Sequence, residues 1–196
     1  MSGYYISSDW HLDHQKAIEY NKRPFADLVE QINYFVKSLE ALPPGSTMFL
    51  LGDLFVYDKK ERVRNVLNLF PKHIDYVFIL GNHDRGLAPV YKQYGRCAEF
   101  LEVKYKTHKL VLSHYPMYEW NRGQYGSLHC FGHCHGHFIH PGRAMDVGWD
   151  AHTQILLMDD VVRILLKKPI HQPCHSKNNG LLIAPDAYPK DKIEKT

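Results

Sequence analysis

Five apolar segments that lie far apart in the sequence all end on an Asp, Asn or His residue. Asp9, Asp53, Asn82, His114 and His133 each stand at or just beyond the last apolar residue of such a segment. In open α/β sheets, ligands bind in the crevice outside the carboxyl ends of the strands. We therefore expect a sheet-based fold in which these five ends converge on one site.

The spacing of apolar residues predicts an α/β fold with an α+β second half. We expect strands at 3–8, 47–51, 76–80, 109–113, 128–131, 144–148 and 161–166. Apolar residues recur at steps of three and four over 26–42 and 59–70, which predicts helices, and Asp27 with Glu30 resembles a capping box at the first. Strands that alternate with helices predict parallel βαβ units in the first half. Shorter turns predict an antiparallel or mixed second sheet.

One domain is expected over residues 1–166. A chain of 196 residues is long enough to bury a core of its own. From residue 167 onward, Pro169, Pro173, Pro185 and Pro189 stand among scattered charges. We therefore expect residues 167–196 to form an irregular C-terminal tail.

The polar residues at the strand ends belong to short motifs that suit a transition metal. The motifs are Asp9-Trp10-His11, Gly52-Asp53, Gly81-Asn82-His83-Asp84, Ser113-His114 and Gly132-His133-Cys134-His135. Carboxylate, carboxamide and imidazole ligands favour Mn, Fe, Co, Ni or Zn over Ca. Two carboxylates with two divalent ions would leave a charge of about +2, or about +1 with a bridging hydroxide. Such a site favours a phosphate anion.

Taken together, these motifs resemble the calcineurin-like metallophosphoesterase superfamily. Its pattern is D-x-H, G-D, G-N-H-[DE], H and G-H-x-H in this order, and all five blocks occur between residues 3 and 150. The segment Asn21-Lys22-Arg23-Pro24-Phe25 is similar to the small prokaryotic and phage members. The resemblance implies a four-layer architecture, a β-sandwich of two mixed sheets flanked by helices.

The resemblance also implies a role for each site residue. One divalent ion would be held by Asp9, His11, Asp53 and His135, and the other by Asp53, Asn82, His114 and His133, with Asp53 bridging. We expect two Mn²⁺ ions, with Fe, Zn, Co or Ni as alternatives. His83 would face the leaving-group oxygen as general acid or transition-state stabiliser. The reaction implied is hydrolysis of a phosphoester by metal-activated hydroxide.

The sequence departs from the protein phosphatases at one position. These carry G-D-x-x-D, in which the second Asp orients the catalytic His, whereas Gly52-Asp53 continues here as Leu54-Phe55-Val56. Asp84 or Asp58 could take that role, and Asp84 joins His83 as a catalytic candidate. The missing Asp favours a phosphodiesterase acting on a small nucleotide-like substrate. A phosphomonoesterase or protein phosphatase and an inactive metal-binding scaffold stay as alternatives.

The amino-acid composition excludes few classes of function. The net charge of +3 has no block of like charges behind it, so there is no strong nucleic-acid signature. Four irregularly spaced cysteines predict free thiols in a reducing compartment. With no signal peptide and no apolar stretch of membrane length, we expect a cytoplasmic protein that acts on a small phosphoester. The sequence does not indicate an oligomeric state.

The cysteines and remaining histidines leave one further alternative. Cys130 and Cys134 lie close in sequence to His137 and His140, which allows a structural zinc site. The usual order of cysteine and histidine ligands is absent, however. We therefore expect His137 and His140 to be polar surface residues.

Overall fold

The first sheet has five strands and is built mainly from the first half of the chain. In the computed structural model, which describes residues 2–57 and 59–171, the strand order is β4-β3-β2-β1-β9. The strands are β1 (Tyr4–Ser7), β2 (Thr47–Leu51), β3 (Asp75–Ile79), β4 (Gly95–Ala98) and β9 (Leu156–Leu157). β1 to β4 are parallel to one another and β9 is antiparallel to β1. The carboxyl ends of β1, β2 and β3 therefore share one edge of the sheet.

The second sheet has four strands in the order β5-β6-β7-β8. They are β5 (Phe100–Tyr105), β6 (His108–Ser113), β7 (Leu128–Phe131) and β8 (Ala144–Asp146). β5 is antiparallel to β6, whereas β6, β7 and β8 run parallel. The sheet is thus mixed, as the sequence predicts. An isolated bridge between Ser8 and Gly148 joins the chain just beyond β1 to the chain just beyond β8.

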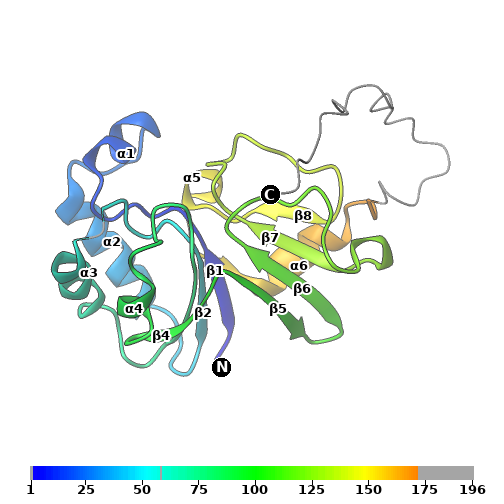
Figure 1. Ribbon diagram of the computed structural model, residues 1–196, viewed down its shortest axis with the longest axis horizontal. Coiled ribbons are helices and arrows are strands. Elements are labelled where there is room, and N and C mark those ends of the chain that lie inside the picture. The colour runs from blue at the N-terminus through cyan, green and yellow to red at the C-terminus, as the bar shows by residue number, and fades with distance from the viewer. Residues whose placement is uncertain (1, 58, 172–196) are drawn as a thin grey trace, which may run out of the picture.

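Four helices lie on the outer side of the first sheet (Figure 1). They are α1 (Gln15–Tyr20), α2 (Leu28–Glu40), α3 (Lys60–Leu67) and α4 (Ala88–Tyr91). Phe35 and Leu39 of α2 pack with Met48 and Leu50 of β2 in the core on that side. The predicted cap of α2 is confirmed, because the Asp27 side chain accepts a hydrogen bond from the Glu30 amide at 2.8 Å.

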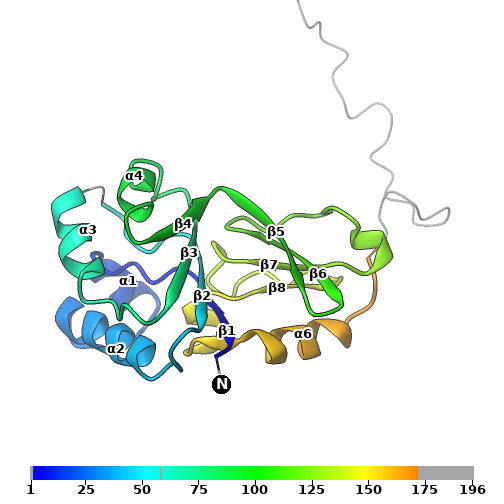
Figure 2. The ribbon, with the colours of Figure 1, turned by 90° about the horizontal axis from the view of Figure 1, so that it is seen from below.

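The core between the two sheets is apolar and is completed by α6 (Met158–Leu166). Ile6 and Leu51 of the first sheet and Leu110 and Leu112 of the second are all buried in it. Figure 2 shows α6 starting beside β1 and running below the strands of the second sheet. The fold class is therefore confirmed as two mixed sheets in a sandwich with flanking helices.

The predicted strand at 161–166 is wrong, because these residues belong to α6. Two adjacent valines, Val161 and Val162, favour a strand on local preference. Met158, Val161, Val162 and Leu165 recur at helical spacing, and all four are buried. Packing against the core between the sheets outweighs the local preference here.

The remaining elements are short. η1 (Gly123–Tyr125) and α5 (Trp149–His152) are single turns of helix. The buried Trp120 covers the outer face of the second sheet, where it packs with Val111, Phe131 and Ala144. The sequence does not predict β4, β5, β9, α1, α4 or α5, because segments of two to six residues carry too little periodicity.

The chain after α6 is described only as far as residue 171. Within that stretch, the Lys168 ammonium donates to the carbonyl of His140 at 3.0 Å. Residues 172–196 lie outside the described residues, so the predicted boundary after residue 166 and the predicted tail stay predictions. No helix within residues 2–57 and 59–171 has the length and apolar character needed to cross a membrane.

Candidate metal centre

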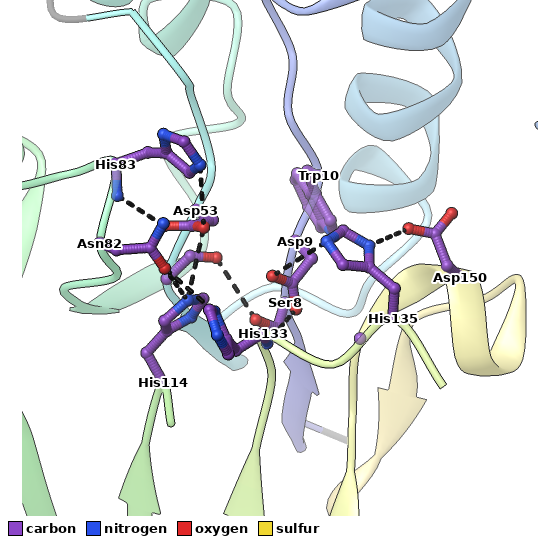
Figure 3. Close-up of polar contacts among 12 residues, drawn as sticks. Ser8, Asp9, Trp10, Asp53, Asn82, His83, His114, His133, His135 and Asp150 are labelled. Carbon is purple, nitrogen blue, oxygen red and sulfur yellow. Dashed lines mark hydrogen bonds and ion pairs between the residues drawn. The ribbon is translucent and has the colours of Figure 1, made fainter. Parts of the chain in front are cut away.

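The seven predicted ligands lie together where the two sheets meet, and Figure 3 labels all of them except His11. Asp9 and His11 follow β1, Asp53 follows β2, Asn82 follows β3, His114 follows β6, and His133 and His135 follow β7. The convergence predicted from the five strand ends is therefore present. Each sheet supplies part of the ligand set, and neither sheet forms the site alone.

The first cluster consists of Asp9, His11 and His135, whose ligand atoms all lie within 4.8 Å of one another. Asp9 and His11 are buried, and the rings of His11 and His135 stack with centroids 5.2 Å apart. Burial lowers the pKa of His11 to about 3, so its imidazole is neutral and its lone pair is free at neutral pH. Burial also raises the pKa of Asp9, to about 6.

The second cluster consists of Asp53, His114 and His133, again with ligand atoms within 4.8 Å of one another. Asn82 lies beside it, with its Oδ1 atom 3.0 Å from His114 Nε2 and 3.0 Å from His133 Nδ1. His114 Nδ1 lies 2.8 Å from the Leu51 carbonyl, which leaves Nε2 facing Asp53 Oδ2 at 3.4 Å. Burial lowers the pKa of His114, but the Asp53 hydrogen bond and nearby carboxylates outweigh it and raise the pKa to about 9.

These residues fit two divalent metal ions. In the described part of the chain, Asp9 Oδ1 and both ring nitrogens of His11 are buried without a hydrogen-bond partner. A buried polar atom left without a partner costs about 1–3 kcal/mol. A bound cation would give these lone pairs a partner, and the mixture of imidazole nitrogen with carboxylate oxygen suits Mn, Fe, Co, Ni or Zn.

Five of the predicted ligands have a left-handed backbone. The φ angles are 61° at Asp9, 51° at His11, 52° at Asp53, 69° at His133 and 48° at His135. Residues held in this region cost of the order of 1–3 kcal/mol each and concentrate at functional sites. Gly132 allows the close approach that this geometry requires, because a Cβ there would overlap the Ser8 hydroxyl and the Asp9 carboxylate.

A buried ion pair that the sequence does not reveal supports the first cluster. His135 Nδ1 lies 2.6 Å from Asp150 Oδ2 (Figure 3). Arg23 binds the same carboxylate through contacts of 2.7 and 2.6 Å. Arg23 also donates to the backbone carbonyl of Asp9 at 2.7 Å. With Nδ1 donating to a carboxylate, His135 directs Nε2 at the cluster, as metal-binding histidines commonly do. Arg23 stands in the 21–25 segment used for the resemblance, but nothing in the sequence pairs it with Asp150.

His83 lies at the open side of the site. Its side chain is 39 % exposed, and its Nε2 atom is 3.8 Å from Asp53 Oδ2. Its backbone amide donates to Asp53 Oδ1 at 3.0 Å, and its ring centroid is 5.7 Å from that of His11. The ring can therefore reach a group bound between the clusters.

Asp84 has a different position from the one a catalytic residue needs. Its carboxylate is fully buried and accepts from the amides of Asp53 and Gly81 at 2.6 and 3.0 Å and from the Tyr91 hydroxyl at 2.6 Å. The described structure places none of these bonds on His83. Asp84 thus fixes the loops that carry Asp53 and His83, and its predicted catalytic role is corrected to a positioning one. Asp58, the other candidate partner, lies outside the described residues.

The alternative of a structural zinc site finds no support. Cys130 is fully buried in the core between the sheets, and neither candidate metal group in the described chain contains a cysteine. His137 is exposed, as predicted. The prediction for His140 is wrong, since it is buried, with Nε2 near the Tyr118 carbonyl and Nδ1 accepting the Gly142 amide. A polar residue with both ring nitrogens satisfied is stable inside the protein.

Comparison with known proteins agrees with this geometry. Residues 4–189 match the calcineurin-like phosphoesterase family. An uncharacterized protein of Methanocaldococcus jannaschii is 31 % identical over 114 residues, which are 57 % of this chain and 58 % of that protein. The chain thus matches little more than half the length of that relative.

One solved structure shows the same fold at low sequence identity. A protein of unknown function from Aquifex aeolicus superposes with a TM-score of 0.65 at 17 % identity, over 84 % of this chain and 100 % of that one. The nuclease MPE of Pseudomonas putida gives a TM-score of 0.44 at 17 % identity, over 67 % of this chain and 61 % of that one. Because the family match covers nearly all of the sequence, the chain belongs to the calcineurin-like phosphoesterase family.

Proposed function

We propose that the protein is a metal-dependent phosphodiesterase that hydrolyses a small nucleotide-like substrate at a two-metal site. The observation that carries the proposal is the pair of adjacent clusters, each with a carboxylate and two histidines. Asp9, His11, Asp53 and His135 would hold one ion, and Asp53, Asn82, His114 and His133 the other. Mn²⁺ is the ion we expect, with Fe, Zn, Co or Ni as alternatives.

The charge of the site supports an anionic substrate. Two divalent ions would supply Lewis acidity and lower the pKa of bound water to near neutral. Asp9 and Asp53 bring two negative charges, and Asp150 adds none because Arg23 balances it. With two divalent ions bound, the site would therefore keep a net positive charge, which favours a phosphate anion.

His83 is proposed as the group that delivers a proton to the leaving oxygen. Its ring is exposed on the side of the site from which substrate would approach, and Asp53 holds its backbone amide. Proton transfer from a positioned side chain contributes typically about 10²–10⁴-fold in rate. Asp84 supports this role from behind by bonding to the Gly81 and Asp53 amides.

Diesters are preferred in this proposal because a monoester dianion needs more cationic support. Arg23 is buried and committed to Asp150. Arg85 lines the pocket beside the second cluster and is the observation that favours the second candidate, a phosphomonoesterase. An inactive metal-binding scaffold is the least supported, because it would have no use for the exposed His83 beside the clusters.

Two comparisons of turnover test the proposal. Protein loaded with Mn²⁺ should hydrolyse bis(p-nitrophenyl) phosphate with kcat/KM at least equal to that for p-nitrophenyl phosphate. A clear monoester preference would overturn the diesterase assignment and leave the metal site standing. His11→Ala is the variant that should lose activity, and exposed His137→Ala is its matched control.

We also retain a reducing, cytoplasmic location as a proposal. Cys97, Cys130 and Cys134 are free thiols in the described part of the chain. Unpaired cysteines are usual in reducing compartments. Cys174 lies outside the described residues.

A further inference from the structure

A pocket of about 640 Å³ opens beside the second cluster. Asn82 and His114 form part of its wall, so the pocket adjoins two predicted ligands. A phosphoester bound at the metals would therefore direct one of its organic groups into this space. The other walls of the pocket show which kind of group fits there.

Tyr115 places an aromatic ring against the second cluster. Its ring centroid lies 4.7 Å from that of His133 and 5.2 Å from that of His114. The Ser113 hydroxyl donates to the Tyr115 carbonyl at 2.7 Å, which fixes the backbone at this point. The side chain is nevertheless 46 % exposed, so part of the ring is open to a ligand.

Phe100 provides a second aromatic surface in the same pocket. It is the first residue of β5 and pairs in register with Ser113, the last residue of β6. Phe100 is 42 % exposed although it begins a strand of a packed sheet. Exposed aromatic side chains that gather at one concave place commonly mark a binding site.

Arg85 and Glu99 add polar groups of opposite charge to these walls. Arg85 follows Asp84 in the loop that carries His83, and Glu99 immediately precedes Phe100. Within the described residues neither forms an ion pair, so both can hydrogen-bond to a ligand. Apolar walls with a few polar groups suit a planar ring that has hydrogen-bonding edges.

We propose that this pocket binds the nucleoside part of the phosphodiester, with the base stacked on Tyr115 or Phe100 and its polar edge near Arg85 and Glu99. The inference rests on the proposed function and names the substrate class for that site. Base–aromatic stacking corresponds to about 5- to 150-fold in affinity per base. The assigned pocket lies on the side of the second cluster, so the group bound in it is the one nearer to His114.

Three diesters with the same p-nitrophenolate leaving group test this assignment. The other ester group is methyl, phenyl or thymidine 5′-, so the bond broken is the same and only the group offered to the pocket changes. We expect kcat/KM to rise in that order, with the thymidine ester at least tenfold above the methyl ester. Equal values for all three, with turnover retained, would overturn the pocket assignment and leave the proposed function intact.

Variants of the pocket residues test which side chains cause the preference for the thymidine ester. Tyr115→Ala should reduce the thymidine-to-methyl ratio of kcat/KM by about 5- to 150-fold, Phe100→Ala should reduce it as well, and Tyr115→Phe should keep it. Tyr125→Ala is the control, because Tyr125 is exposed beside Arg122 at another surface. An unchanged ratio in both alanine variants would refute the assignment. Turnover of none of the three esters would overturn the proposed function and the assignment with it.

Binding can be measured without turnover. In saturation-transfer NMR with metal-free protein and thymidine, the base protons should receive saturation from the wild-type protein. The signal should be strongly reduced with Tyr115→Ala and unchanged with Tyr125→Ala. Signals in both Tyr115→Ala and Phe100→Ala equal to that of the wild type would place the base elsewhere and contradict the proposal.

Discussion

The two clusters of the candidate site contain the same kinds of side chain but are supported differently. In the first cluster, His11 has two ring nitrogens without a partner and Asp9 has one such oxygen, among the residues described. His135 is held from behind by the buried pair of Asp150 and Arg23. The first cluster is therefore held in shape by the protein while some of its polar atoms still lack a partner.

In the second cluster, the polar side chains are partners of one another. The Asn82 oxygen lies 3.0 Å from a nitrogen of His114 and from one of His133, and Asp53 lies 3.4 Å from His114. His133 is also exposed. An ion entering here must displace interactions that already exist, whereas an ion entering the first cluster adds partners that are missing. We therefore expect the first cluster to bind its ion more tightly.

Removing the metals should have the largest effect and tests the comparison directly. Complete chelation should abolish activity, and Mn²⁺ should restore it. Graded chelation should release one of two ions first, and that ion should belong to the second cluster. Elemental analysis after each step measures the stoichiometry. In His11→Ala the tighter ion should be missing, and in His133→Ala the weaker one. Simultaneous loss of both ions, or a maximum of one ion per chain, would contradict the difference between the clusters.

His83→Ala should separate chemistry from metal binding, since His83 belongs to neither cluster. We expect kcat to fall by about 10²–10⁴-fold, the usual value of a positioned proton donor. Elemental analysis should still find both ions. His137→Ala, an exposed histidine outside both clusters, serves as the control. Full activity of His83→Ala would show that water or another residue supplies the proton.

Asp150→Asn should weaken only the first cluster. Loss of a carboxylate behind a metal-binding histidine typically lowers metal affinity by about 10–100-fold. Isothermal titration with Mn²⁺ should show this decrease for the tighter site and an unchanged weaker site. Asp159→Asn is the control, because Asp159 pairs with Lys106 at an exposed position. An equal loss at both sites would show that Asp150 holds the whole centre together.

His129 provides a test outside the two clusters, because it is a buried histidine whose two ring nitrogens both have partners. Its Nδ1 atom lies 3.0 Å from the Val111 carbonyl, and Nε2 accepts the Met117 amide at 3.1 Å. Burial lowers its pKa from 6.5 to about 4, so the folded protein holds it neutral. Below pH 6.5 the unfolded chain takes up a proton that the folded chain does not. This contribution to stability is thus complete above pH 6.5 and decreases towards pH 4, by up to about 1.4 kcal/mol per pH unit.

His129→Gln should flatten that dependence. Denaturant unfolding of metal-free protein at several pH values between 7 and 4 measures the free energy of unfolding. The difference between wild type and variant should decrease as the pH falls. His137→Gln, an exposed position, should leave the slope unchanged. A slope that stays the same in His129→Gln would mean that this ring is protonated in the folded protein.

The predicted site residues stand in local motifs, whereas parts of the fold around them depend on contacts between distant residues. Each predicted ligand stands in a short motif at the end of an apolar strand, and the structure brings these seven side chains close together. Asp150 could not be found in this way, because its partner Arg23 is 127 residues away and nothing in the sequence pairs the two. The role of Asp84 also depends on contacts, namely those with Tyr91 and two loop amides.

The prediction of secondary structure was wrong where local preference and packing disagree. Val161 and Val162 favour a strand, but the core between the sheets accommodates them on one face of α6. His140 was expected at the surface because histidine is polar, yet both of its ring nitrogens have partners inside the protein. These features depend on which distant residues meet, and a single sequence does not report that.

Both clusters take side chains from both sheets, so bound ions would connect the two sheets. Asp9 and His133, which are 124 residues apart, already meet through a hydrogen bond of 2.9 Å. A covalent cross-link that closes a loop of about 100 residues removes about 4.7 kcal/mol of chain entropy from the unfolded state. Bound ions would restrain the same loop as reversible cross-links. Metal content would then determine how easily the two sheets separate. Resistance to proteolysis and to mechanical unfolding would depend on the bound ions, as turnover of substrate does.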